Sequence, residues 1–302
     1  MEDMITGLCP QCGHTLHIPA ELASFSCMYC GARLTKKQLA AEPLAAPEAD
    51  EDRAAYYDRA VSRLGWCIKN FGGYQKKIMR DVFFEAFETY EAGCAPVIQE
   101  LARGVAPEQQ TQLLERAAAA MLDELEAGWQ KKGDMEDEKI VLAIFFVPMV
   151  RKQQLPISEE FVTILQKQWV ERYPKSPFYL GDYESISGGF RKKFLGLCFI
   201  TTAVCQELGK PDDCEELTAF RAFRDGYLRS QPDGEALIRE YYNIAPGIVT
   251  CINTCSDRHA SYARIREEYL APCYQDLLAG RNESCKARYV RMVRDLEREY
   301  FS

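Results

Sequence analysis

Two Cys-x-x-Cys motifs lie within the first 30 residues, and they constrain this chain more than any other feature. They pair Cys9 with Cys12 and Cys27 with Cys30, fourteen residues separate them, and a glycine follows each one. Each motif forms a tight turn that presents two thiolates, and four thiolates in a tetrahedron suit Zn²⁺. Four ordinary buried cysteines are the alternative. The double motif favours one structural zinc ion bound by Cys9, Cys12, Cys27 and Cys30.

Residues 8–34 resemble the CPxCG type of zinc ribbon. Short alternating stretches at Thr15–Ile18 and Ser24–Cys27 predict a small β unit around the cysteines. His14 and His17 are close enough to serve as alternative ligands, but with four cysteines present we expect them in a strand or turn. So small a unit depends on its metal to fold.

The pattern changes to a helical period after a stretch rich in alanine, proline and acidic residues. The predicted fold class is mostly α, with a small N-terminal β zinc ribbon, a linker and an all-α body. The expected domains are a zinc ribbon at 1–35, a linker at 36–52, a helical domain at 53–190 and a second helical domain at 191–302. The two helical domains could also pack as one body.

Apolar spacing and cap residues predict the individual helices. The expected helices cover 76–91 with Gly93 as C-cap, 109–129, 136–152, 158 to before Pro174, 212 or 213 to 228, 234–243 halted near Pro246, and 256 or 257 to 278. Ser158 is the expected N-cap of its helix, and residues 174–190 are expected to form a loop. A last helix carries one apolar stripe: Cys285, Tyr289, Val293, Leu296 and Tyr300.

Residues 198–248 begin Cys198-Phe-Ile-Thr201-Thr202-Ala and continue through a Phe-Arg-Ala-Phe-Arg-Asp block to a pair of tyrosines and Ala-Pro. This string resembles the CFI-box C-terminal domain, a family of bacterial proteins of unknown function. The resemblance implies a compact, mostly helical module and names no activity. Its motif residues here are Cys198, Thr201, Thr202, Arg221, Arg224, Asp225, Tyr241 and Tyr242.

Helical spacing gives the motif a structural interpretation. The apolar residues expected to pack inward are Leu217, Phe220, Phe223 and Tyr227. Arg221 and Asp225 are four apart and can pair on the helix surface, whereas Arg224 could hold a carbonyl or carboxylate elsewhere. Tyr241 and Tyr242 are expected to close the core, and Thr201 and Thr202 to bond backbone groups locally.

A thiol enzyme is the rival interpretation, with Cys198 or Cys205 as nucleophile. A Cys–His pair in the body would have to use His259, since the other two histidines lie in the ribbon. Because Cys198 follows an apolar stretch, we expect it to be buried, structural and inert. Cys251, Cys255 and His259 are spaced by four and form a conceivable second metal site, although a helix start near Ser256 would break their common face.

Charge and cysteine usage narrow the function further. The net charge is −8 and the pI about 5.2, and residues 1–40 contain three basic and three acidic residues, so nucleic-acid binding by the ribbon is the weakest hypothesis. The start shows no signal peptide, and the apolar run at 140–150 is too short to span a bilayer. Thirteen cysteines without an export signal favour reduced thiols in a cytoplasm. We expect a non-enzymatic cytoplasmic protein that acts through a protein partner, with no membrane association.

Overall fold

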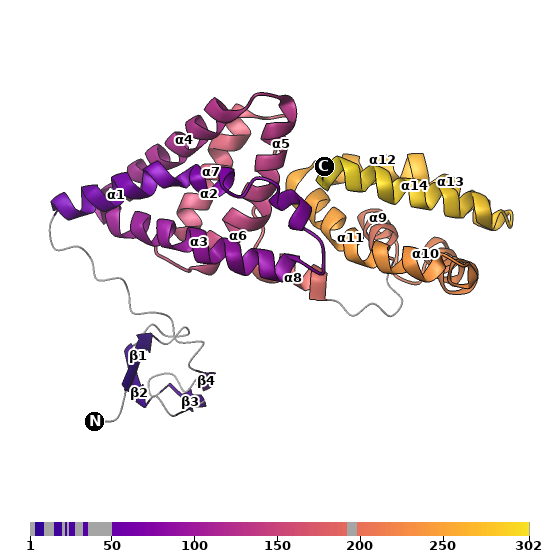
Figure 1. Ribbon diagram of the computed structural model, residues 1–302, viewed down its shortest axis with the longest axis horizontal. Helices are drawn as coiled ribbons and strands as arrows, with labels where there is room; N and C mark the ends of the chain where they lie inside the picture. Colours follow the sequence, from indigo (N-terminus) through magenta and orange to yellow (C-terminus); the bar gives the residue numbers. More distant parts are fainter. Residues whose placement is uncertain are drawn as a thin grey trace.

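The computed structural model describes residues 4–8, 15–19, 22, 24–27, 33–35, 50–191 and 198–301. It is mostly helical, with a small β part at the N-terminal end (Figure 1). This confirms the predicted fold class. Residues 36–49 of the expected linker and residues 192–197 of the second expected helical domain lie outside the described residues.

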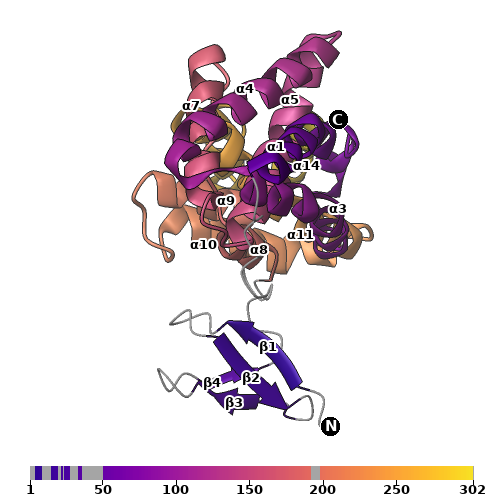
Figure 2. The same ribbon diagram turned by 90° about the vertical axis from the view of Figure 1, so that its left-hand side faces the viewer.

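The N-terminal β part consists of two antiparallel hairpins, seen best in Figure 2. Strand β1 (Met4–Leu8) pairs with β2 (Thr15–Pro19), and β3 (Ser24–Ser26) pairs with β4 (Arg33–Thr35). Leu16, Cys27 and Leu34 are buried together, and Phe25 packs against them. The β unit expected around the cysteines is therefore present.

The first half of the helical body contains eight α-helices among the described residues. They are α1 (Asp50–Leu64), α2 (Trp66–Lys69), α3 (Phe83–Gly104), α4 (Gln110–Gly128), α5 (Lys132–Val141), α6 (Val147–Lys152), α7 (Ser158–Arg172) and α8 (Tyr183–Arg191). Short 3₁₀ turns at η2 (Tyr74–Lys77) and η3 (Pro107–Gln109) precede α3 and α4, and a π-helical turn, η4 (Leu142–Phe146), joins α5 to α6.

The second half contains α9 (Phe199–Glu207), α10 (Glu215–Ala222), α11 (Gly234–Cys255), α12 (Arg258–Ile265), α13 (Ala271–Leu278) and α14 (Asn282–Phe301). A π-helical turn, η5 (Phe223–Tyr227), and a 3₁₀ turn, η6 (Leu228–Ser230), follow α10, and a π-helical turn, η7 (Arg266–Leu270), joins α12 to α13. Figure 1 shows this half, in orange and yellow, beside the α1–α8 half. The apolar stripe predicted for the last helix faces inward on α14, where four of its five residues are buried and Tyr289 is half-buried.

One continuous apolar core runs through both halves of the helical body. The run Ile140–Val150 is buried throughout, as its composition predicts, and Phe145 packs against the rings of Tyr74, Phe83 and Tyr90. Backbone hydrogen bonds also join the halves, since the Tyr179 N–H donates to the Thr254 carbonyl at 2.7 Å. The two expected helical domains therefore share a core.

Two helices continue through residues that were expected to end them. Helix α3 starts at Phe83 instead of Lys76 and continues past Gly93. On its buried face, the Tyr90 hydroxyl and the Cys94 thiol both bond the carbonyl of Cys67, which holds the helix on both sides of Gly93 against the core. Helix α11 likewise continues past Pro246 to Cys255.

The segment of α11 around Pro246 is tightly packed. A methyl group on Gly247 would lie 1.8 Å from the carbonyl oxygen of Ile78, so only glycine permits this close approach. Ile244, Ala245, Ile248 and Ile252 around it are fully or almost fully buried. Their burial outweighs the roughly 3 kcal/mol that a proline costs inside a helix.

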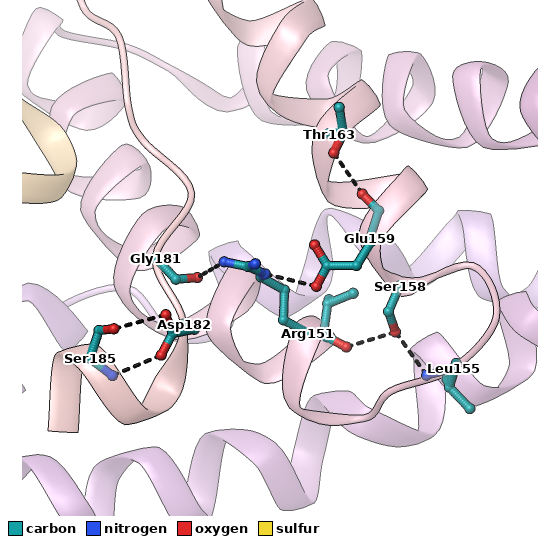
Figure 3. Close-up of polar contacts among 9 residues, drawn as sticks. Arg151, Leu155, Ser158, Glu159, Thr163, Gly181, Asp182 and Ser185 are labelled. Carbon is teal, nitrogen blue, oxygen red and sulfur yellow. Dashed lines mark hydrogen bonds and ion pairs between the residues drawn. The ribbon is translucent and has the colours of Figure 1, made fainter. Parts of the chain in front are cut away.

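The segment expected to be a loop at 174–190 becomes helical in its second part. Figure 3 shows Asp182, which accepts from the Ser185 N–H at 2.7 Å and from the Ser185 hydroxyl at 2.8 Å at the start of α8. Arg151 donates to the Gly181 carbonyl at 3.0 Å and to Glu159 at 2.9 Å, which attaches the segment to α6 and α7. The buried Ile186 and Phe190 then anchor α8 to the core.

Ser158 starts α7 but does not cap it in the expected way. Its hydroxyl donates to the Val150 carbonyl at 2.8 Å. It also accepts from the Leu155 N–H at 3.1 Å, as Figure 3 shows. It therefore closes the turn between α6 and α7. Asp257, one of the two residues predicted to open the next helix, caps α12 and accepts from the Ala260 N–H at 3.1 Å.

Within the described residues, the helices are all too short or too polar to cross a membrane.

Candidate functional site

Most of the predicted motif residues lie where α9, the π-helical turn η5, α11 and α14 meet. Cys198 is the N-cap residue of α9, and its carbonyl accepts from the Thr202 N–H at 2.6 Å. The thiol is buried, with 4% of the residue exposed. The prediction from the sequence that Cys198 is buried is therefore confirmed.

Arg224 is the buried cation of this site. Its Nε and Nη2 donate to the two Asp225 carboxylate oxygens at 2.8 and 2.6 Å, and its Nη1 donates to Cys198 Sγ at 3.5 Å. The hydrogen bonds with Asp225 raise the pKa of the Arg224 guanidinium and lower the pKa of the Asp225 carboxyl. Arg224 thus holds a carboxylate, one of the two roles considered for it, and reaches the thiol as well.

The expected pairing of Arg221 with Asp225 is wrong. Arg221 instead donates to the backbone carbonyl and to the carboxylate of Asp212, at 2.7 and 2.8 Å. The regular α10 that carries Arg221 ends at Ala222, and Asp225 lies in the π-helical turn that follows. Asp225 meets its neighbour Arg224 and, at 3.9 Å, Arg229.

A chain of hydroxyl groups satisfies the start of α9. The Ile200 N–H donates to the Tyr241 hydroxyl at 3.0 Å, the Tyr289 hydroxyl donates to Tyr241 at 3.3 Å, and Thr201 shares a 3.1 Å hydrogen bond with Tyr289. The first N–H groups of a helix have no partner within it, so Tyr241 supplies one from α11. Burial raises the pKa of both tyrosines, which keeps the hydroxyls protonated.

The remaining motif residues support this arrangement. Tyr242 is half-buried and contacts the ring of Phe199 edge-on, with 6.2 Å between ring centroids. The Thr202 hydroxyl is buried and finds no hydrogen-bond partner among the residues that the structure describes. Leu217, Phe220 and Phe223 are buried as predicted, whereas Tyr227 is half-buried and donates to Glu283 at 2.7 Å.

A cavity of about 60 Å³ opens beside Cys198 and Arg224. Its other lining residues are Phe220, Phe223, Leu228, Leu237, Ile238, Glu240, Tyr241, Tyr289, Val290, Val293 and Arg294. The volume exceeds the roughly 10–15 Å³ that one water molecule needs and is smaller than the roughly 150 Å³ of an engineered cavity that admits benzene. The site therefore suits a small aliphatic group.

The Cys198 thiol is protonated at neutral pH. Burial raises its pKa, and the nearby Arg224 lowers the pKa by less than burial raises it. His259, the histidine considered as its partner, lies on α12 with most of its side chain exposed and contacts Glu207 at 3.4 Å. The cavity joins Cys198 to Arg224 but not to this histidine.

Other predicted site residues are separated or lie outside the described residues. Cys251 and Cys255 are buried on α11, apart from the exposed His259, and the described residues contain no group of three side chains arranged to hold a metal. Of the predicted zinc ligands, Cys27 is described and buried, whereas Cys9, Cys12 and Cys30 lie outside the described residues, as does His14.

The sequence interpretation missed the contribution of α14 to this site. Tyr289, Val293 and the neighbouring Val290 and Arg294 complete the cavity from a helix almost ninety positions away. The stripe of Tyr289 and Val293 signalled that α14 faces a core, but not which helix it meets.

A second cavity, about 510 Å³, lies between α8, α9, α11 and α12 and was also missed. Glu207 borders it and is already paired with Arg258 at 2.9 Å, and Tyr262 donates to Asn253 at 3.0 Å. No described lining residue has a buried polar atom without a partner. Its buried side-chain polar atoms therefore all have partners.

Comparisons with protein-family models, with curated proteins and with solved structures gave no match for this chain.

Proposed function

We propose that this chain is a non-enzymatic, cytoplasmic zinc-ribbon protein of the CFI-box family that acts through protein–protein contacts. The cavity beside Cys198 and Arg224 would receive a small aliphatic side chain of the partner. In this role the helical body binds the partner, and the ribbon holds a structural zinc ion.

The apolar lining of the cavity is the observation that carries this proposal. Leu228, Leu237 and Val290 are half-buried there, so part of their apolar surface meets solvent. Covering such surface is favourable by roughly 25 cal/mol per Å². A partner side chain that fills the cavity would therefore bind favourably, and the residues that line the cavity are already held in place by the fold.

The polar groups at the cavity favour binding over chemistry. Arg224 and the two tyrosines are engaged in hydrogen bonds with the protein itself, and burial keeps the Cys198 thiol protonated. Glu240 and Arg294 form a 2.5 Å ion pair between α11 and α14 and give the opening a polar edge. Apolar centres with polar rims are typical of protein interfaces.

A zinc ion would suit the N-terminal β part. The buried residues described there are few, with Leu16, Cys27 and Leu34 as the core, which is too little apolar burial to hold two hairpins. Zn²⁺ on Cys9, Cys12, Cys27 and Cys30 would cross-link the hairpins and supply that stability. Nucleic-acid binding by the ribbon remains the weakest alternative, because a basic stripe is missing from its sequence.

Thiol chemistry at Cys198 is the second candidate function, and the 3.5 Å contact with Arg224 favours it. A guanidinium beside a thiol at a helix N-terminus lowers the thiol pKa. Here burial has the larger effect, so the pKa stays above its ordinary value. Binding is therefore the better-supported function.

Selection of peptides against the full-length protein tests the proposal. A displayed library should yield peptides that share an aliphatic anchor residue. Leu237→Glu places a charge in the cavity wall and should weaken the binding of a selected peptide at least tenfold, because the carboxylate would be desolvated by the anchor. Leu278→Glu is the matched control, since Leu278 is 63% exposed on α13, away from the cavity lining.

Two results would contradict the proposal. The first is that the selected peptides share no aliphatic anchor, and the second is that they bind the Leu237→Glu and Leu278→Glu variants equally well. In either case, the cavity would not be the docking point.

A further inference from the structure

Cys205 and Cys214 form a pair of neighbouring thiols at the opposite end of α9 from Cys198. Their sulfur atoms are 3.9 Å apart. Cys205 is buried on α9, whereas Cys214 is half-buried and precedes α10 as its N-cap residue. A disulfide has a sulfur–sulfur distance of about 2.05 Å, so small side-chain rotations would bring these atoms together.

Backbone hydrogen bonds fix the turn between the two cysteines. Gly209 adopts a left-handed conformation with φ of 67°, and the Lys210 N–H donates to the Cys205 carbonyl at 2.9 Å. The Gly209 N–H donates to the Gln206 carbonyl at 3.0 Å. These two bonds form a Schellman motif, which ends α9 and reverses the chain.

Contacts from the same turn fix the beginning of α10. Lys210 forms a 2.5 Å ion pair with Glu216. Arg221 donates hydrogen bonds to the backbone carbonyl and to the carboxylate of Asp212. The Cys214 N–H donates to the Pro211 carbonyl at 3.1 Å. The approach of Cys214 to Cys205 is therefore fixed by the surrounding structure.

We infer that Cys205 and Cys214 form a reversible disulfide when the protein meets a peroxide. The sulfur of Cys214 attacks one peroxide oxygen, the O–O bond breaks, and Cys214 becomes a sulfenic acid with release of water. The sulfur of Cys205 then attacks the Cys214 sulfur, the S–O bond breaks, and a second water leaves as the disulfide forms. Two thiols lose two electrons and the peroxide gains them. A cellular dithiol would reverse the reaction by thiol–disulfide exchange.

The order of the two steps follows from exposure. Cys214 reaches solvent, so a small oxidant meets it first. Burial raises the pKa of Cys205 to about 12, which makes it a poor first nucleophile. Its position against Cys214 lets it react as soon as a sulfenic acid forms there.

The chain supplies internal controls in two further pairs of cysteines. Cys94 Sγ lies 3.9 Å from the carbonyl of Cys67, and Cys273 Sγ lies 3.8 Å from the carbonyl of Cys285. All four are fully buried. We expect them to stay reduced under conditions that oxidise Cys205 and Cys214.

The test treats the reduced full-length protein with hydrogen peroxide, blocks free thiols with N-ethylmaleimide and digests it without reduction. Cleavage after glutamate places Cys205 in residues 185–207 and Cys214 in residues 208–215, so a disulfide joins two separate peptides. Mass spectrometry should find this linked pair, and dithiothreitol should abolish it. Fragmentation distinguishes Cys205 from Cys198, which lies in the same peptide.

Two variants define the mechanism. Cys205→Ala should leave a sulfenic acid on Cys214 that dimedone labels more strongly than in the wild type, and Cys214→Ser should leave Cys205 reduced. Because Cys214 is only half-buried, its serine variant keeps the test valid even if the Cys205 variant fails to fold. Absence of the linked peptides while the buried pairs oxidise at the same peroxide dose would overturn the inference, and so would dimedone labelling of Cys205 in the Cys214→Ser variant.

Discussion

The two halves of the helical body fill their interiors differently. Of the twelve largest fully buried side chains in the described residues, eleven lie in residues 50–191 and only Phe220 lies in residues 198–301. The second half instead buries Arg224, a chain of hydroxyl groups and a cavity. Large aromatic groups contribute most to stability, whereas polar groups and cavities lower it. The difference gives the first half the larger share of the stability, and it agrees with the binding role that we propose for the second.

The largest effect should come from the aromatic core of the first half. Phe145→Ala removes a fully buried ring that packs against Tyr74, Phe83 and Tyr90. We expect urea denaturation to show a loss of about 3–5 kcal/mol in the free energy of unfolding. Tyr179→Ala, at a residue 45% exposed, is the control and should change it by less than about 0.5 kcal/mol. A loss below about 1 kcal/mol for Phe145→Ala would remove the contrast between the halves.

A smaller loss of stability should follow from Arg224→Met in the second half. The variant removes two hydrogen bonds to Asp225, whose half-exposed carboxylate can turn to water, so we expect about 1–2 kcal/mol. The pKa of Cys198 should rise further, because Arg224 lowers it in the wild type. Denaturation and pH-dependent alkylation measure the two effects. Arg229→Met removes an exposed partner of Asp225 and should change neither quantity much.

The Arg224–Asp225 pair should also leave a pH signature. Arg224 holds the pKa of Asp225 below its ordinary value of 3.8, so the ionised carboxyl stabilises the folded protein above that value. This contribution is lost as the pH falls through the lowered pKa. Because Asp225 is half-exposed, the difference between wild type and Asp225→Asn should be below about 1 kcal/mol at pH 6 and should shrink as the pH falls below 3.8. A difference that grows on acidification would show that the pair does not stabilise the fold.

The smallest effect on the helical body should come from the ribbon. Cys9→Ser combined with Cys12→Ser should release about one zinc ion per chain, measured by elemental analysis. The helical circular dichroism and the unfolding midpoint of the body should stay unchanged, since the core of Leu16, Cys27 and Leu34 is separate from the main core. Full retention of zinc by the double variant would place the metal elsewhere.

Local signals in the sequence predicted much of this fold. The helix at 110–128 was located within one residue at each end, and Asp257 was one of the two residues predicted to open α12. Such features depend on neighbouring residues, which the sequence shows directly. The failures at Gly93, at Pro246 and at the α8 segment have one cause: packing against distant residues such as Ile78 and Arg151 overrides local preference.

The candidate site was also predictable only in part, because its local motif is visible in the sequence and its contacts with distant residues are not. The motif contained Cys198, Arg224 and Tyr241, but the family resemblance did not predict which of these residues contact one another. Tyr289 joins the site from the last helix, and Cys214 meets Cys205 only because the turn between them reverses the chain. The π-helical turn that contains Asp225 has no sequence signature of its own.

Alkylation of Cys198 in the native protein tests most directly whether the second half binds or reacts. The protein is treated with iodoacetamide at pH 7, and mass spectrometry follows Cys198, with the half-buried Cys214 as internal reference. The binding account predicts that Cys198 is modified far more slowly than Cys214 and at a rate limited by unfolding, because the thiol is buried and protonated. Rapid and selective modification of Cys198 would contradict it and establish a reactive thiol beside Arg224.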